Sequence, residues 1–323
     1  MYCRRRTALA GTIGPRAWIG CVSLDSFKKI TADDYRLLKS FLDRENFHAC
    51  DYSAGNLVLW SDEYETSYAV AEDTLFLRFR AGNEMNFTFP MGARDLPAAF
   101  AWLKAYCAES GTPLRMNLVE PAMFERVEAA FPGEYSVEYS RDNADYLYNV
   151  TDLASFSGKR YHGKKNHVNA FLAACPDWTY EPITDKNTSE CIEMARAWCK
   201  LNECCQDHMK HAEMCVLVKA LGLRATLGLT GGVLRTGGRI VALALGERCV
   251  DMVIEHFEKA FSDVPGAYSM ICQQFARNEA GGALYVNREE DMGVEGLRKS
   301  KESYRPAFMG EKGVLVPKAG PGA

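Results

Sequence analysis

The stretch Tyr285–Pro306, YVNREEDMGVEGLRKSKESYRP, organises the interpretation of the whole chain. An apolar run at residues 283–286 predicts a short strand that leads into Asn287, two glutamates and Asp291. A glycine follows, and then four cations: Arg298, Lys299, Lys301 and Arg305. Acidic and basic side chains at this density, beside a strand end, are typical of a site that handles charged ligands. A solvated charged helix is the alternative interpretation.

The composition limits the class of protein. A length of 323 residues suits two domains, and 47% hydrophobic with 25% charged residues is typical of a soluble globular chain. No apolar run reaches the roughly 20 residues that span a bilayer. Residues 1–150 hold 16 basic against 21 acidic residues, and the remainder holds 22 against 21. This balance excludes a general nucleic-acid coat, so a polyanion would have to bind at local patches.

The cysteines and the N-terminus indicate the cell compartment. Twelve cysteines are scattered along the chain, several in apolar surroundings such as those of Cys107 and Cys272. Without a convincing secretion signal, they are interpreted as reduced thiols of a cytoplasmic protein. Residues 1–22 are interpreted as a disordered or incidental extension.

The order of predicted elements repeats. Periodicity and turn residues predict, in the first half, helices at 31–46, 94–109 and 121–131, and strands at 56–60, 66–71, 74–80, 85–90, 114–119, 135–139 and 146–150. In the second half they predict helices at 158–174, 188–204, 209–221 and 264–278, strands at 225–234, 239–246, 250–257 and 283–286, then the charged helix and a last strand at 313–316. We therefore expect an α+β protein of two tandem acetyltransferase-like (GNAT) domains, residues 23–150 and 151–323, each a mixed, mostly antiparallel sheet flanked by helices.

The third strand of the second half carries candidate catalytic groups. Regular alternation would place His256 and Glu258 on one face of the sheet, where either could accept a proton from an attacking amine or hydroxyl. A solvated strand end explains the same residues. The next helix begins near Gly266 and Tyr268, and a helix start can offer free N–H groups to a phosphate or an oxyanion.

A basic stretch opens the second half. Residues 153–176 hold no acidic residue and four cations: Lys159, Arg160, Lys164 and Lys165. They could bind an RNA backbone while Tyr161 stacks on a base. The alternative is the basic start of a surface helix.

Other chemistries lack support. Cys204/His208 and His211/Cys215 are i,i+4 pairs, but neither C-x-x-C nor H-E-x-x-H occurs, so no metal site is predicted. No G-x-S-x-G, Walker or G-x-G-x-x-G motif occurs either, so serine hydrolysis, NTP hydrolysis and dinucleotide chemistry are not indicated.

Three segments together resemble the DUF2156 family, which is related to the C-terminal domain of phosphatidylglycerol lysyltransferases. They are residues 158–167, residues 255–260 with Gly266 and Tyr268, and residues 287–306. The resemblance spans about Ile30 to Pro317. It implies a tandem GNAT fold, similar also to the Fem-type peptidyltransferases, and transfer of an aminoacyl group from aminoacyl-tRNA to an acceptor.

The resemblance also implies roles for individual residues. Cations would contact tRNA or lipid phosphate, and Glu258 or His256 would help to deprotonate the acceptor. Lys301 and Asp291 would position the donor ester and stabilise the oxyanion. The residues expected to contact substrate are Lys159, Arg160, Lys164, Lys165, Gly266, Tyr268, Asn287, Arg298, Lys299 and Tyr304.

Three functions remain open at this point. The first is an aminoacyl-tRNA-dependent transferase acting on a lipid head group, peptide or small amine, although this chain lacks the membrane-spanning half of the lysyltransferases. The second is an acyl-CoA-dependent N-acyltransferase, although the loop Q/R-x-x-G-x-G/A of GNAT enzymes is missing. The third is a non-catalytic module that binds polyanions. No cofactor and no oligomeric state is indicated.

Overall fold

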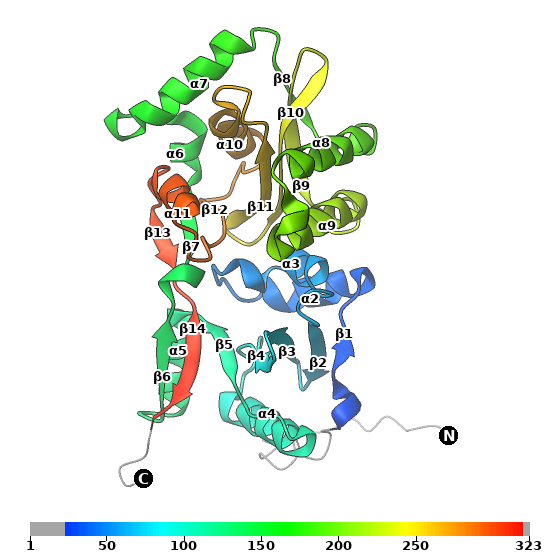
Figure 1. Ribbon diagram of the computed structural model, residues 1–323. Helices are drawn as coiled ribbons and strands as arrows, with labels where there is room; N and C mark the ends of the chain where they lie inside the picture. Colours follow the sequence, from blue (N-terminus) through cyan, green and yellow to red (C-terminus); the bar gives the residue numbers. More distant parts are fainter. Residues whose placement is uncertain (1–22, 319–323) are drawn as a thin grey trace.

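The computed structural model describes residues 23–318, and the extension expected at residues 1–22 lies outside this range. Two seven-stranded sheets are arranged one above the other in Figure 1, each flanked by helices. The expected α+β class, with two mixed and mostly antiparallel sheets, is confirmed. No helix within the described residues combines the length and the apolar character needed to cross a bilayer.

The first sheet has the strand order β1-β2-β3-β4-β5-β14-β6. All neighbours are antiparallel except β4 and β5. Its strands are β1 (Lys28–Lys29), β2 (Ser67–Ala71), β3 (Thr74–Ala81), β4 (Glu84–Phe87), β5 (Met116–Val119), β6 (Tyr135–Tyr139) and β14 (Gly313–Pro317).

The second sheet has the order β13-β7-β12-β11-β10-β9-β8. Here only β11 and β12 are parallel neighbours. The strands are β7 (Asp145–Asn149), β8 (Thr179–Pro182), β9 (Thr230–Thr236), β10 (Arg239–Arg248), β11 (Met252–Ala260), β12 (Tyr285–Asn287) and β13 (Phe308–Gly310).

The helices begin and end where the sequence supplies caps. In α4, the Asp95 side chain accepts a hydrogen bond from Ala98 N at 2.9 Å, and Gly111 ends the helix in the left-handed conformation. The α-helices are α2 (Tyr35–Leu42), α3 (Ala54–Leu59), α4 (Leu96–Ser110), α5 (Pro121–Ala130), α6 (Val150–Ser155), α7 (His162–Ala174), α8 (Thr188–Leu201), α9 (His208–Leu223), α10 (Ala267–Asn278) and α11 (Glu295–Glu302).

One predicted strand is a helix. Residues 56–60 belong mostly to α3, because Ser53 caps its start by accepting a hydrogen bond from Asn56 N at 3.1 Å. A short apolar run fits a buried helix as well as a buried strand, and the cap decides between them. The helix is therefore fixed by one polar residue upstream of the apolar run.

The two sheets exchange strands near the expected domain boundary. β7 precedes residue 150 but pairs with β12 and β13 of the second sheet, whereas β14 returns to pair with β5 and β6 of the first. A boundary between residues 150 and 151 therefore does not separate the sheets. The chain crosses between them twice, because the last strand completes the sheet that the first residues began (Figure 1).

Candidate functional site

The segment Arg288–Asp291 directly follows β12, and each of its four charged side chains reaches a different partner. Lys301, on α11, holds the backbone of this segment. Its Nζ donates to the carbonyl oxygens of Arg288, Glu289 and Glu290 at 2.5–3.1 Å. Burial lowers the pKa of Lys301. Because its three donors are used on carbonyl oxygens, Lys301 positions Arg288 rather than an oxyanion, which corrects the predicted catalytic role.

Arg288 lies between two carboxylates of β11. The ladder between β11 and β12 ends at Ile254 and Asn287, so Arg288 lies just beyond the last paired residues. Its Nε donates to Glu255 Oε2, and its Nη2 lies 2.7 Å from Glu258 Oε2. Glu255 is buried and the other two side chains are largely so, with 9% of Arg288, 2% of Glu255 and 11% of Glu258 exposed.

A β-bulge explains why Glu255 and Glu258 meet. In the pairing of β10 with β11, Gly246 opposes Glu255 and Leu245 opposes Phe257, so His256 has no opposite residue. An extra residue in one strand reverses the alternation of side chains beyond it. The prediction that His256 and Glu258 share a face is therefore wrong, because regular alternation does not continue through this strand.

Glu258 has the properties of a general base. Burial raises its pKa to about 8, against the opposing effect of the Arg288 charge. A proton acceptor works best when its pKa lies near the working pH, because it must both accept and release the proton. Arg288 fixes the orientation of the carboxylate. The general-base role of Glu258 stays a prediction, with which this environment is compatible.

Lys164 and Tyr304 complete this group. Lys164 Nζ lies 3.3 Å from the centroid of the Tyr304 ring, and the Arg288 guanidinium carbon lies 4.7 Å from the same centroid. Burial, followed by the Arg288 charge, lowers the pKa of Lys164 to about 8. We call these five residues, Glu255, Glu258, Arg288, Lys164 and Tyr304, the Arg288 cluster.

His256 and Glu289 form the next pair along the segment. His256 Nδ1 lies 2.9 Å from Glu289 Oε1, and its Nε2 lies 3.6 Å from Glu247 Oε2. Burial lowers the pKa of His256, but the two neighbouring carboxylates, Glu247 and Glu289, outweigh this effect and raise it to about 9. A protonated histidine held between two carboxylates is a poor base, so we assign it a structural role in place of the predicted catalytic one.

Asp291 is a fully engaged carboxylate. It accepts two hydrogen bonds from Arg298, at 2.9 and 2.8 Å, and others from Arg141 and from the hydroxyl of Tyr146. The Arg298 hydrogen bonds, and to a lesser degree the other donors, hold its pKa well below the usual range. Asp291 and Arg298 therefore fix α11 to the loop before β7, and the Asp291 carboxylate, which has no exposed surface, is not free to position a donor ester.

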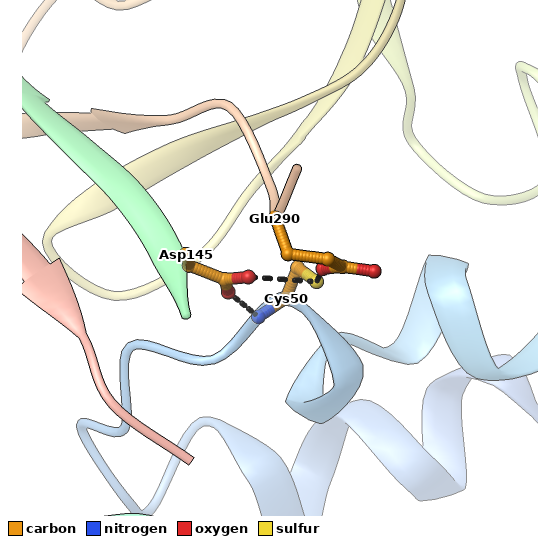
Figure 2. A group of neighbouring side chains, drawn as sticks. All are labelled: Cys50, Asp145 and Glu290. Atoms are coloured by element: carbon orange, nitrogen blue, oxygen red, sulfur yellow. Dashed lines mark hydrogen bonds between the residues drawn. The ribbon is translucent and has the colours of Figure 1, made fainter. Parts of the chain in front are cut away.

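Glu290 belongs to a second buried group, which we call the junction cluster. Lys312 Nζ lies 2.6 Å from Asp51 Oδ2, 3.0 Å from Asp145 Oδ1 and 3.2 Å from Glu290 Oε2. It also lies 3.5 Å from Cys50 Sγ. Figure 2 shows Cys50, Asp145 and Glu290 converging from three parts of the chain. These three could approach a metal ion, but the Lys312 ammonium already supplies the cation among them.

Asn287, the last residue of β12, is hydrogen-bonded both to the junction cluster and to the backbone of the segment Arg288–Asp291. Its Nδ2 donates to Asp145 Oδ2 at 2.9 Å and to the carbonyl of His48 at 2.7 Å. Its Oδ1 accepts from Glu289 N at 2.7 Å, which stabilises the left-handed backbone of Glu289 (φ 58°). The prediction that Asn287 contacts substrate is not supported, because this side chain has no exposed surface.

The start of α10 is covered. A Cβ at Gly266 would lie 1.9 Å from the carbonyl oxygen of His167 in α7, so glycine is required here by close packing. Tyr268 accepts a hydrogen bond from Trp198 Nε1 at 3.2 Å and lies at the surface. The predicted phosphate cradle at Gly266 is instead a contact between two helices.

The remaining cations lie outside the Arg288 cluster. Lys159, Arg160 and Lys165 are exposed at and before the start of α7, where Arg160 pairs with Asp152 at 2.8 Å. Lys299 is exposed and pairs with Glu295 on α11. Lys164 therefore differs from its neighbours, because it alone of these reaches the Arg288 cluster.

Sequence reasoning missed two central residues. Arg288 stands inside the quoted stretch without being among the candidate site residues, and regular alternation along residues 250–257 would place Glu255 on the face opposite to Glu258. An arginine whose two glutamate partners lie on another strand, far away in the sequence, leaves no motif that could be recognised around it in the sequence. Only the end of the β11–β12 ladder brings these groups together.

Comparison with known proteins agrees with this fold. The sequence model of the family described as "Phosphatidylglycerol lysyltransferase, C-terminal" matches residues 43–312. A crystal structure of a conserved protein of unknown function from Bacteroides thetaiotaomicron is similar at a TM-score of 0.86 and 37% identity, over 90% of this chain and 99% of that chain.

Two further similarities are more distant. A DUF2156 domain, described as the C-terminal part of a candidate lysylphosphatidylglycerol synthetase from Agrobacterium fabrum, has a TM-score of 0.63 at 12% identity over 90% of this chain and 92% of that one. This likeness shows the fold alone. An uncharacterized protein of Mycoplasmoides gallisepticum is 24% identical over 182 residues, which cover 54% of this chain and 57% of that protein.

Proposed function

Because this chain belongs to the family of phosphatidylglycerol lysyltransferase C-terminal domains, we propose that it is an acyltransferase that takes an aminoacyl group from aminoacyl-tRNA. The acceptor would be the amine or hydroxyl of a lipid head group, a peptide or a small amine. The observation that carries this proposal is the largely buried Glu258, held by Arg288, with the half-buried Lys164 near enough for its charge to act on this carboxylate.

The proposed chemistry follows from these groups. Glu258 accepts the proton of the acceptor as its nitrogen or oxygen attacks the ester carbonyl of the donor. Lys164 stabilises the negative charge that develops on the carbonyl oxygen, because it carries three N–H donors. Like Arg288, it lies over the ring of Tyr304. The tRNA 3′-hydroxyl leaves, and the proton passes from Glu258 to it.

The exposed cations of α7 support an RNA donor. Lys159 and Lys165 lie on the same short segment as Lys164, which reaches the Arg288 cluster. A tRNA bound along the exposed face of α7 would place its aminoacylated 3′ end near Glu258. Electrostatic attraction to such a patch is sequence-independent and weakens steeply as salt is added.

The acyl-CoA alternative has less support. GNAT enzymes hold the pyrophosphate of CoA at the helix start that corresponds to α10, and this start packs against the backbone of α7. A cradle for phosphate needs backbone N–H groups that a ligand can approach.

The experiment is a transfer assay with a set of charged tRNAs and candidate acceptors, comparing wild type with Glu258→Gln. We expect the variant to lose about 10²- to 10⁴-fold in rate, the usual contribution of a general base. Glu302→Gln is the matched control, because this glutamate is exposed on α11. Equal rates for wild type and Glu258→Gln would contradict the assigned role, and transfer from acetyl-CoA alone would overturn the proposed donor.

A further inference from the structure

Three cysteines meet at the end of α8, outside the two clusters described above. Cys199 lies in the last turn of α8, and Cys204 and Cys205 begin the short 3-10 helix Cys204–Gln206 that follows. Between them the chain reverses at Glu203, whose backbone is left-handed (φ 51°), so that the 3-10 helix lies back against the end of α8. We call Cys199, Cys204 and Cys205 the thiol cluster.

The three thiols differ in their access to solvent. Cys205 is exposed, Cys199 is half-buried and Cys204 has no exposed surface. Burial, followed by the neighbouring thiols of Cys204 and Cys205, raises the pKa of the Cys199 thiol to about 11. The thiolate is the reactive form of cysteine, and an oxidant arrives from solvent. Cys205 is therefore the thiol that an oxidant meets first.

The geometry favours a disulfide over a shared metal ion. The ligating atoms of a tetrahedral zinc site lie within about 4 Å of one another. In the described part of the chain, the group of three side chains that approaches this closely is Cys50, Asp145 and Glu290, and the thiol cluster does not. A disulfide needs only two sulfurs, on Cα atoms about 4.4–6.8 Å apart, and two cysteines on either side of a chain reversal can meet this condition.

We infer that the thiol cluster is a redox-modification site, at which hydrogen peroxide oxidises Cys205 and Cys199 then closes a disulfide with it. The Cys205 thiolate attacks one peroxide oxygen, the O–O bond breaks, and a sulfenic acid and one water form. The Cys199 sulfur then attacks the Cys205 sulfur, the S–O bond breaks, and the hydroxide leaves with the Cys199 proton as a second water. Two thiols and one peroxide give one disulfide and two waters, a modification typical of transient, redox-sensing disulfides inside cells.

The test is peptide mapping of the full chain after treatment with hydrogen peroxide, alkylation of the remaining thiols and digestion with trypsin. Lys200 lies between the two cysteines, so trypsin separates Cys199, in residues 197–200, from Cys205, in residues 201–210. We expect these peptides to be joined, at the sum of their masses less two hydrogen atoms, and to separate when dithiothreitol is added. Peptides that stay separate after peroxide, or Cys199 joined to another peptide, would overturn the inference.

Serine variants identify the partner of Cys199. Cys205→Ser should lose the joined peptide, whereas Cys204→Ser should keep it, because Cys204 is shielded from the oxidant. Cys215→Ser is the matched control, since this exposed thiol lies 3.8 Å from His211 Nε2 on α9, and it should leave the joined peptide unchanged. A joined peptide that persists in Cys205→Ser and is lost in Cys204→Ser would contradict the assignment. The wild-type map decides the inference even where a variant fails to fold.

Discussion

The Arg288 cluster and the junction cluster begin from the same four-residue segment, but they differ in how completely their polar atoms are paired. In the junction cluster, Lys312 lies within 3.2 Å of three carboxylates, and none of its buried polar side-chain atoms lacks a partner. In the Arg288 cluster, Glu255 Oε1 and Glu258 Oε2 have no hydrogen-bond partner, although Glu258 Oε2 lies 2.7 Å from Arg288 Nη2, and the pKa values of Glu258 and Lys164 are each shifted to about 8.

This difference distinguishes a cluster that stabilises the fold from one that could take part in a reaction. Charge density is equally high in both clusters, so density alone does not identify a site. The junction cluster also holds a group with a pKa near neutrality, since burial raises the pKa of Asp145 to about 7. The pKa values alone therefore do not separate the clusters; the difference is that the buried polar atoms of the junction cluster are all paired, whereas the Arg288 cluster leaves buried oxygens without a hydrogen bond. The junction cluster therefore holds the two sheets in place, and the Arg288 cluster carries the proposed reaction.

Removing the junction cation should have the largest effect on stability. Lys312→Met leaves three buried or half-buried carboxylates without their cation, which we expect to cost about 3–5 kcal/mol of unfolding free energy. Chemical denaturation measures this. Lys299→Met is the control, because this lysine is exposed, and it should change stability little. A loss below about 1 kcal/mol in Lys312→Met would contradict the structural role of the cluster.

Lys301 holds the backbone of the segment from which both clusters begin, so its removal should lower the rate of the proposed transfer. Lys301→Met releases the three carbonyl oxygens that hold Arg288, Glu289 and Glu290. We expect kcat to fall about 10- to 100-fold, with KM for the donor nearly unchanged, because a misplaced group costs this order of rate. The pH dependence of the remaining activity should also shift, since Arg288 no longer fixes the charge beside Glu258. An unchanged pH profile would indicate a purely structural role.

The smallest expected effect lies outside both clusters. Lys165→Ala removes one exposed cation of α7 and should weaken tRNA binding equally for charged and uncharged tRNA. The slope of log affinity against log salt should fall by about one. Lys200→Ala, an exposed change on α8, is the control. An unchanged salt slope in Lys165→Ala would place the RNA on another surface.

The sequence allowed the fold class to be predicted, because the order of helices and strands is local information. It also named Glu258, Lys164 and Tyr304, which the structure brings together in one cluster; their roles stay predictions. It did not reveal the strand exchange, since β7 and β14 look like any other strand until their partners are known. It misplaced Asn287, Asp291 and Lys301, because a sequence shows that polar side chains are present but not that every polar atom is already paired.

The position of Glu255 was missed for a different reason. One unopposed residue, His256, reverses the alternation along β11, and nothing in the local sequence marks this bulge. The partner of Glu255 is 33 residues away, so the pairing depends on the tertiary arrangement of β11 and β12.

The pH dependence of wild-type transfer tests the central claim most directly. With saturating donor and acceptor, and with spontaneous ester hydrolysis subtracted, the rate should rise about tenfold per pH unit between pH 6 and 7.5, because Glu258 must be deprotonated to act as a base. The rate should reach a maximum near pH 8, where the pKa of Glu258 lies, and fall above it as Lys164, whose pKa is also about 8, loses its charge. The rise below pH 8 should disappear in Glu258→Gln. A rate that is flat over this range, or an unaltered rise in Glu258→Gln, would contradict the assignment of Glu258 as the base.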